Sequence, residues 1–534
     1  MRHCVKARMK HYIQPFEYEL ALQELVALSE SELAELPNGG DLPIEFALQS
    51  KQPKAVLANR LAYWEIVEDE LGPQVTVQSL RESTVNLVRN GVAIEVLRGR
   101  LPFFGDIPLP NRRCLRYGTH GIHEYRGKFF PQLVRSLINI SGAPVGGVVA
   151  DPMSGSGTTV VEALLAGCRG MGLDMNPLSV FLGRTKADLL SADANAIAAD
   201  YELIRSELMA VEPHNSTHTS HLSSLPKEDQ AYIADWFSKD VLDGLDDIVA
   251  AISRRTYEPS KALSTVALSN IIRSVSWQKV EDLRVRREIR LDVELDPKKE
   301  FLEELGRSVR AVLAFLFQNG KAPSNQFTIT EGDAKDCGTV WGESTVDVII
   351  TSPPYATALP YLDTDRLSLC YLGLLSRPTH RARDKAMIGN REVTEKQRSL
   401  YWQRYEAQRS ELPAAICELI DKIERLNEGT GVGFRRRNLP ALLSKYFFDM
   451  KDVIKGMKLA LKPGCVAFVV VGNNHTIAGG QHVDIQTASL LNDIAASVGF
   501  EVASSLSMEM LVSRDIFKKN AMGSEEILAF KKPA

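Results

Sequence analysis

From residue 146 to the end of the chain, short apolar runs alternate with helical stretches, and this alternation restricts the fold more than any other feature. Residues 146–150 (GGVVA) predict a short buried strand, 158–167 (TTVVEALLAG) a helix ending at glycine, and 169–174 (RGMGLD) a second strand. Further β segments are expected at 326–333, 346–350, 465–471, 500–511 and 525–532, and a helix at 449–464. Strands alternating with helices predict an α/β fold: a parallel, doubly wound sheet with helices on both faces.

Three parts of the chain do not follow the alternation. Residues 191–320 are helical and charged, and 376–440 are basic, with three aromatic residues in LYWQRY. Both stretches are predicted as insertions at the edges of the sheet. Residues 1–110 are predicted as a separate N-terminal domain, in which 17–28 and 58–71 have helical spacing of apolar residues. Glycine and proline predict a loop at 36–43 and a linker at 101–111.

Length and composition indicate a protein of the cytoplasm, without a membrane-spanning segment and with its cysteines as free thiols. The chain has 534 residues, enough for two or three domains, and its apolar run at 465–471 is far too short to span a membrane. No apolar segment follows the basic N-terminus, so we expect no signal peptide and a cytoplasmic location. The seven cysteines have no regular spacing, which favours free thiols over disulfides or zinc. His120 and His123 lack a third ligand nearby, so no metal site is expected.

The charge distribution leaves room for a local nucleic-acid groove. A net charge of −4 argues against a protein that coats nucleic acid without specificity. Residues 273–290 nevertheless hold six Arg or Lys against three Asp or Glu, and 376–409 hold nine against four. These stretches are either phosphate-binding surfaces or solvated helix faces, and the sequence leaves both readings open.

A glycine-rich turn, DPMSGSGTT (151–159), directly follows the first predicted strand. A phosphate loop would require a lysine that is absent here, and a dinucleotide fingerprint would require glycine where Val160 stands. S-adenosylmethionine is the third reading, since its charged groups suit Asp151 beside a tight glycine turn. Asp174 ends the second strand, where a carboxylate can accept both ribose hydroxyls. Asp333 ends the third strand and is placed to meet the adenine edge.

The fourth predicted strand ends in Ser352, Pro353, Pro354 and Tyr355. Proline has no N–H and fixes φ, so the turn is stiff. The Ser352 hydroxyl and the Pro353 carbonyl offer two acceptors at fixed angles, and Tyr355 offers a stacking face. This arrangement suits the exocyclic amine of a nucleic-acid base, whose nitrogen must become pyramidal before it can attack a methyl sulfonium. In a duplex, such a base has to be flipped out.

In this order, DPMSGSGTT, GLDMNP, EGDA and TSPPY resemble the motifs of amino-methylating DNA methyltransferases, the cytosine-N4 and adenine-N6 class. Residues 121–138 resemble the segment that precedes the glycine loop in those enzymes and helps to hold the methionine end of the cofactor. The resemblance covers about half of the chain. It implies a Rossmann-like class I methyltransferase fold and S-adenosyl-L-methionine as cofactor. The cofactor-binding residues that it implies are Lys128, Phe129, Asp151, Met153, Gly155, Ser156, Gly157, Thr158, Asp174, Met175, Asp333 and Ala334. The catalytic residues are Ser352, Pro353, Pro354 and Tyr355.

The base that is methylated stays open at this stage. Serine at the head of the motif is more typical of the cytosine-N4 subgroup, whereas adenine-N6 enzymes more often carry aspartate. No cysteine adjoins the motif, which argues against C5 methylation through attack on the ring. The N-terminal stretches also resemble tRNA guanine-N2 methyltransferases, which usually carry Asp-Pro-Pro-Tyr. An inactive fold that only binds nucleic acid is the remaining alternative.

The resemblance gives each part of the chain an expected role. Residues 1–110 are an accessory domain, 111–190 the cofactor half of the core, 191–320 a target-recognition insertion, 321–375 the catalytic half, 376–440 a DNA-contacting insertion, and 441–534 the C-terminal strands. Residues 359–373 should form a helix behind the site, in which Asp363, Asp365 and Arg366 bond to one another or touch substrate. The expected partners are double-stranded DNA, or RNA in its place, and a restriction or defence protein, with no membrane. On DNA the protein would be associated with the nucleoid.

Overall fold

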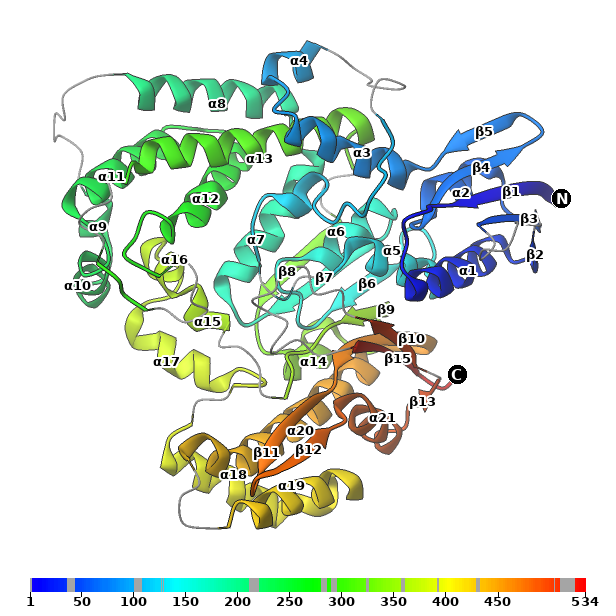
Figure 1. Cartoon of the computed structure of the whole chain (residues 1–534), viewed down its shortest axis with the longest axis vertical. Coiled ribbons are helices and arrows are strands. Elements are labelled where there is room, and N and C mark those ends of the chain that lie inside the picture. The colour runs from blue at the N-terminus through cyan, green and yellow to red at the C-terminus, as the bar shows by residue number, and fades with distance from the viewer. Residues whose placement is uncertain are drawn as a thin grey trace.

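The predicted sheet lies at the centre of the computed structural model (Figure 1). The structure describes residues 2–35, 44–99, 108–125, 127, 129–210, 220–279, 286–289, 295–322, 326–356, 361–390, 393–428, 433–503, 505–509 and 524–534. The strands of the sheet are β6 (Val148–Asp151), β7 (Arg169–Asp174), β8 (Phe327–Glu331), β9 (Val346–Thr351), β10 (Leu461–Gly472), β13 (Glu501–Val502), β14 (Leu506–Glu509) and β15 (Ser524–Lys531). Their order is β13-β15-β10-β9-β6-β7-β8, with β14 also paired to β15. The strands from β10 to β8 are parallel, and β15 runs antiparallel to β10.

The central strands are mostly apolar because both faces of the sheet are covered. Val149 and Val348 belong to a core cluster on one face, together with side chains of α5 (Pro131–Ile140). Their neighbours Ala150 and Ile349 belong to a cluster on the other face, which helices α14 (Cys337–Trp341), α20 (Phe434–Ala460) and α21 (Thr487–Ser497) complete. Adjacent residues of a strand point to opposite faces, so a strand buried on both sides carries an unbroken apolar run.

The strand order places a binding crevice at one edge of the sheet. The chain passes from β6 outward to β7 and β8, then returns to add β9 and β10 on the other side of β6. The order therefore reverses between β6 and β9. In open α/β sheets, ligands bind outside the carboxyl ends of the strands at such a reversal. The helices that follow β6 and β7 are α6 (Thr158–Leu165) and α7 (Pro177–Asp188).

The N-terminal part forms a second, antiparallel sheet of order β2-β3-β1-β4-β5. Its elements are β1 (His3–Met9), α1 (Pro15–Ser29), β2 (Leu33–Glu35), β3 (Glu45–Ser50), α2 (Lys54–Arg60), β4 (Trp64–Asp69), β5 (Gly72–Val75), α3 (Val77–Arg89) and α4 (Ile94–Gly99). The helix predicted at 17–28 is confirmed as α1. The helical reading of 58–71 is wrong, because 64–69 pair with β1 and β5 as strand β4. Strand partners on both sides, with Trp64 and Val67 buried, override a helical spacing of apolar residues. The loop at 36–43 and most of the linker at 101–111 lie outside the described residues.

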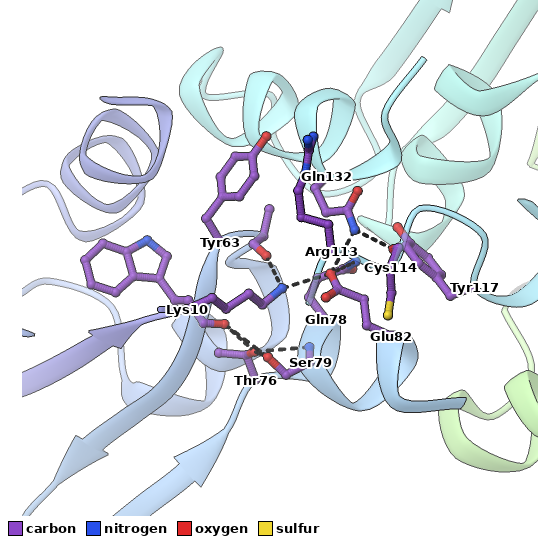
Figure 2. A network of polar contacts seen from close by, with 12 residues as sticks. Lys10, Tyr63, Thr76, Gln78, Ser79, Glu82, Arg113, Cys114, Tyr117 and Gln132 are labelled. Atoms are coloured by element: carbon purple, nitrogen blue, oxygen red, sulfur yellow. Dashed lines mark hydrogen bonds and ion pairs between the residues drawn. The ribbon is translucent and has the colours of Figure 1, made fainter. Parts of the chain in front are cut away.

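The N-terminal sheet shares its core with the central sheet. Phe46 and Trp64 belong to the same apolar cluster as Val348, and α1 packs against α5. A buried polar network also joins the two parts (Figure 2). Lys10 Nζ lies 2.8 Å from Glu82 Oε1, and Gln132 Nε2 of α5 donates to the same oxygen at 3.0 Å. The domain boundaries remain predictions, but the packing is continuous across residue 110.

Two helical groups flank the sheet (Figure 1). The first lies between β7 and β8 and includes α8 (Ala194–Met209), α9 (His221–Ser224), α10 (Lys227–Ala234), α11 (Lys239–Ser253), α12 (Glu258–Ile272) and α13 (Pro297–Asn319). The second, between β9 and β10, includes α15 (Tyr361–Thr364), α16 (Arg366–Tyr371), α17 (Arg377–Ala386), α18 (Glu395–Gln408), α19 (Ala414–Leu426) and α20. A hairpin of β11 (Asn474–Ala478) and β12 (Gln481–Ile485) lies beside α20 in Figure 1. No helix in the described residues is long and apolar enough to cross a membrane.

Candidate active site

A cavity of about 660 Å³, counting the space open to solvent, lies where the strand order reverses. Its size falls within the roughly 300–1,000 Å³ of small-molecule sites. Most lining residues lie at or just after the carboxyl ends of four parallel strands, two precede α5, and two belong to a short segment of the second helical group. They are Tyr125, Gly127, Pro152, Met153, Gly155, Asp174, Met175, Asp333, Ala334, Ser352, Pro354, Met387 and Ile388. The structure therefore brings six of the predicted cofactor residues and two residues of the predicted catalytic turn to one cavity.

The glycine loop is shaped by two close approaches. Gly155 has φ of +49°, and a Cβ there would lie 3.1 Å from the ring of Tyr125. Gly157 has φ of +80°, and a Cβ there would lie 2.7 Å from the Cα of Gly183 in α7. Positive φ and the absence of a side chain explain why glycine occupies both positions. The first glycine opens the cavity wall, and the second lets α6 and α7 pack closely.

Asp174 connects the end of β7 to the glycine loop. Its Oδ2 accepts a hydrogen bond from the Gly155 N–H at 2.8 Å, and its Oδ1 accepts one from the Asn176 N–H at 2.8 Å. Burial raises the pKa of the Asp174 carboxyl to about 6, against the lowering effect of those two N–H groups. Each oxygen keeps acceptor capacity on the cavity side, so the carboxylate can still receive two ligand hydroxyls.

Asp151 does not line the cavity, although the sequence suggested direct contact with the cofactor. Only 1% of the residue is exposed. Its Oδ1 accepts the Met153 N–H at 3.0 Å, and its Oδ2 accepts the Thr159 hydroxyl at 2.8 Å. Burial raises the pKa of this carboxyl to about 6. Asp151 thus stabilises the conformation of the loop, since its hydrogen bonds join both ends of the glycine turn.

Asp333 lies two residues after the end of β8, the neighbour of β7, and lines the cavity. Lys335 Nζ lies 3.2 Å from Asp333 Oδ2 and 3.7 Å from Asp449 Oδ1 in α20. Lys445 pairs with Asp449 and donates to the carbonyl of Met387 at 3.2 Å. A chain of alternating charges therefore runs behind the cavity and connects two of its walls.

The catalytic turn lies at the end of β9. Ser352 and Pro354 line the cavity, whereas Pro353 is buried and contributes no lining surface. Tyr355 is half-buried, and its hydroxyl donates to Glu525 in β15. Behind this turn, α15 and α16 replace the single predicted helix, and Arg366 pairs with Asp363 at 3.0 Å.

Four other predicted cofactor residues, all within the described part of the chain, do not line the cavity. Ser156, Gly157 and Thr158 are buried at the start of α6. Phe129 packs against the core cluster beside α5. Lys128 lies outside the described residues. Their direct cofactor contacts stay predictions.

His120, one of the two histidines that the sequence argued against as metal ligands, has a structural partner. Its Nε2 lies 2.8 Å from Glu162 Oε1, and both side chains are buried. The same Glu162 oxygen accepts the Tyr117 hydroxyl at 2.6 Å. His120 therefore belongs to a buried polar cluster beside α6.

Sequence reasoning missed five of the lining residues. Tyr125, Gly127 and Pro152 lie within the segments that carried the resemblance, so a wider reading of those segments would have found them. Met387 and Ile388 follow α17 in the second helical group, and no sequence signal marked them. The helix is fastened there by Arg383, which pairs with Glu331 and donates to the Met175 carbonyl at 3.0 Å.

The donor and acceptor set fits S-adenosyl-L-methionine. Asp174 and Asp333 provide carboxylate oxygens on two adjoining walls, which suit ribose hydroxyls and the adenine amine. Met175, Ala334 and Ile388 provide apolar surface for a ring between them. The buried Ser154 hydroxyl, for which the described structure provides no hydrogen-bond partner, belongs to the same loop.

Comparison with known proteins gives matches to methyltransferases. Residues 123–205 match the family described as UPF0020, RMKL-like, methyltransferase domain. The chain is 22% identical over 445 residues to type II methyltransferase M.BsoBI of Geobacillus stearothermophilus, covering 73% of this chain and 81% of that protein. It is 27% identical over 267 residues to M.MvaI of Kocuria varians, covering 48% and 58%. With M.AvaI of Nostoc sp. it shares 32% over 161 residues, covering 29% and 31%.

Among solved structures, TTHA0409 from Thermus thermophilus complexed with S-adenosyl-L-methionine matches 38% of this chain and 54% of that chain at 16% identity. Its TM-score of 0.19 is too low for the superposition to bear on the fold. The sequence matches, the sheet order and the cavity nevertheless agree with one another. The chain is therefore similar to DNA methyltransferases, a class of enzymes that use S-adenosyl-L-methionine as cofactor.

Proposed function

We propose that this protein transfers a methyl group from S-adenosyl-L-methionine to the exocyclic amine of a base in DNA, with cytosine N4 as the favoured position. One observation carries the proposal. The cavity is lined on one side by Gly155, Asp174 and Asp333, and on the other by Ser352 and Pro354. A cofactor and an amine bound to these two sides would lie next to each other, as methyl transfer requires.

The proposed chemistry assigns a task to each side of the cavity. The cofactor supplies a methyl group on a sulfonium. Asp174 and Asp333 accept hydrogen bonds from its sugar and base and fix its position. The Ser352 hydroxyl and the Pro353 carbonyl would accept hydrogen bonds from the two N–H groups of the target amine, which directs the nitrogen lone pair toward the methyl group. A new N–C bond forms as the S–C bond breaks, and one amine proton leaves to water.

Ser352 is the basis for preferring cytosine. The residue heads the motif where adenine-N6 enzymes more often carry aspartate, and it lines the cavity. Adenine N6 and tRNA guanine N2 are the alternative targets of the same mechanism.

The relatives also suggest a biological context. Several of them are named type II methyltransferases. We therefore expect a restriction endonuclease or another defence protein as functional partner, double-stranded DNA as substrate, and a cytoplasmic location on the nucleoid. The helical group between β7 and β8 is the proposed target-recognition part, and the group between β9 and β10 the proposed DNA-contacting part.

The decisive experiment is transfer of labelled methyl groups to duplex DNA, single-stranded DNA and tRNA, followed by nucleoside analysis. N4-methylcytosine in duplex DNA is the expected product. N6-methyladenine would change the base but keep the mechanism, and N2-methylguanosine in tRNA would overturn the substrate class. No transfer to any of the three would overturn the proposal.

A further inference from the structure

Glu525, a residue outside every motif found in the sequence, binds the hydroxyl of Tyr355. The Tyr355 O–H donates a hydrogen bond to Glu525 Oε1, with 2.5 Å between the oxygens. The contact joins the turn after β9 to the beginning of β15, 170 residues further along the chain. Burial raises the pKa of the Glu525 carboxyl, against the lowering effect of the hydrogen bond from Tyr355.

The sheet topology brings Glu525 to the catalytic edge. Because β15 runs antiparallel to β10, its first residues lie beside the carboxyl ends of the parallel strands. Glu525 pairs with Gly472, the last residue of β10, and β10 separates β9 from β15. Neighbouring strands lie about 4.8 Å apart. The side chains of Tyr355 and Glu525 therefore meet across the end of β10, where Gly472 has no side chain to separate them.

This hydrogen bond restricts what Tyr355 can offer a substrate. A phenol has one hydroxyl proton, and here it is donated to Glu525. Hydrogen bonds to a carboxylate are about twice as strong as those between neutral groups. The ring is therefore fixed at its backbone and at its hydroxyl, next to Pro354, which lines the cavity.

We propose that Glu525 is a positioning residue for methyl transfer, which holds the Tyr355 ring in place as the stacking face for the flipped base. The inference rests on the proposed function and extends it, since it adds a residue on β15 to a site otherwise built from β6 to β9. Glu525 itself touches neither cofactor nor base in this arrangement.

The test is a double-mutant cycle in the full-length protein. Glu525→Ala and Tyr355→Phe should each lower kcat/KM for the methylated nucleic acid by about tenfold, and the double variant should be no worse than either single one. The lower kcat/KM should come from binding and methylation of the nucleic acid. The Kd of S-adenosyl-L-methionine, measured by calorimetry, should stay unchanged. Glu525→Gln, whose amide oxygen still accepts the Tyr355 proton, should keep most of the activity.

Glu526→Ala is the matched control. Glu526 is the next residue of β15, and its carboxylate accepts hydrogen bonds from Asn473 at 2.8 Å and Ser505 at 3.2 Å rather than from Tyr355. Its kcat/KM should stay near that of the wild type. Additive losses in the double variant, or a Glu525→Gln variant as weak as Glu525→Ala, would overturn the role of Glu525 while leaving the proposed function intact. A wild-type protein that methylates neither DNA nor RNA would overturn both.

Discussion

At the scale of single residues, the site depends on carboxylates that are both structural and ligand-facing. Asp174 holds the glycine loop through the Gly155 N–H and still lines the cavity. Asp151 has similar hydrogen bonds but no cavity surface. The two residues look equivalent in the sequence, because each ends a strand. Because only Asp174 lines the cavity, ligand binding is proposed for Asp174, whereas Asp151 supports the loop.

Replacement of Asp174 by asparagine should weaken cofactor binding by about 1–3 kcal/mol, because a buried site loses a charged acceptor. The wild type should also show a pH dependence. Burial raises the Asp174 pKa to about 6, so the carboxylate is ionised above that pH and accepts both ribose hydroxyls. Below pH 6, binding must release a proton, and affinity should fall by up to about tenfold per pH unit. Calorimetry of S-adenosylhomocysteine binding from pH 5 to 8 measures both effects.

The asparagine variant also identifies the titrating group. If Asp174 carries the pH effect, the variant should bind equally at pH 5 and pH 8. A fall that persists in the variant would assign the titration to Asp151, whose pKa is likewise raised to about 6.

Ser352→Ala should show the opposite pattern to the Asp174 variant. The lost hydroxyl is one of two acceptors for the target amine, so methyl transfer at saturating cofactor should fall by about tenfold to a thousandfold. Cofactor affinity should stay within about twofold of the wild type, because the adenosine contacts lie on Asp174 and Asp333. Single-turnover kinetics and calorimetry on the same preparations check the two halves. A variant with full methyl-transfer rate would refute the role of the serine.

At the scale of elements, two arginines of α17 have different surroundings and therefore different expected roles. Arg383 pairs with Glu331 and binds the Met175 carbonyl, so it fastens the helix to the cavity wall. Arg381, two residues earlier, is exposed. A basic stretch in the sequence therefore contains both a structural arginine and a candidate phosphate contact, and charge counting alone does not separate them.

The two arginines make a matched pair. Arg381→Ala should weaken DNA binding and reduce the salt dependence of binding by about one unit of slope, as expected for one lost phosphate contact. Arg383→Ala should leave that slope unchanged and weaken cofactor binding several-fold. The variant loses the contacts that hold α17 against the cavity wall, where Met175 and Met387 lie. DNA affinity measured across a salt series, with cofactor calorimetry beside it, distinguishes the two. An unaltered slope for Arg381→Ala would show that Arg381 contacts no phosphate and belongs to a solvated helix face.

At the scale of the whole molecule, a buried ion pair within the N-terminal part is joined to the central sheet through Gln132. Lys10 and Glu82 are 2% and 1% exposed, and Glu82 also accepts from Gln78 and Gln132 (Figure 2). Gln132 lies in α5, which covers the central sheet. Breaking a buried pair leaves one charge uncompensated, and this costs far more than losing an exposed pair.

Lys10→Met should therefore destabilise the protein by about 3–5 kcal/mol, seen as a lower Tm. The double variant Lys10→Met with Glu82→Gln should recover much of the loss, since the glutamine is neutral and its oxygen still accepts from Gln78 and Gln132. Lys51→Met is the control in the same part of the chain, because Lys51 pairs with Glu30 at 2.7 Å on the exposed surface and should change Tm little. Equal effects of the two lysine variants would show that the buried pair has no anchoring role.

Sequence pattern alone predicted the order of the parallel strands along the chain, the glycine loop, and the polar residues at the strand ends. These follow from local chemistry: buried strands are apolar runs, tight turns need glycine, and a Pro-Pro turn is stiff in any context. Local pattern was therefore sufficient to place the motif at 351–355 and the carboxylates Asp174 and Asp333 at one edge of a sheet.

Which of those residues face the cavity, and which distant residues join them, depends on the packing of the folded chain. Met387 and Ile388 line the cavity although they belong to an insertion. Glu525 lies near Tyr355 because β15 runs antiparallel to β10, two strands away from β9. Residues 64–69 became a strand because partners on both sides were available. In each case the deciding interaction joins segments far apart in the chain, and such interactions depend on packing of the whole molecule rather than on local sequence pattern.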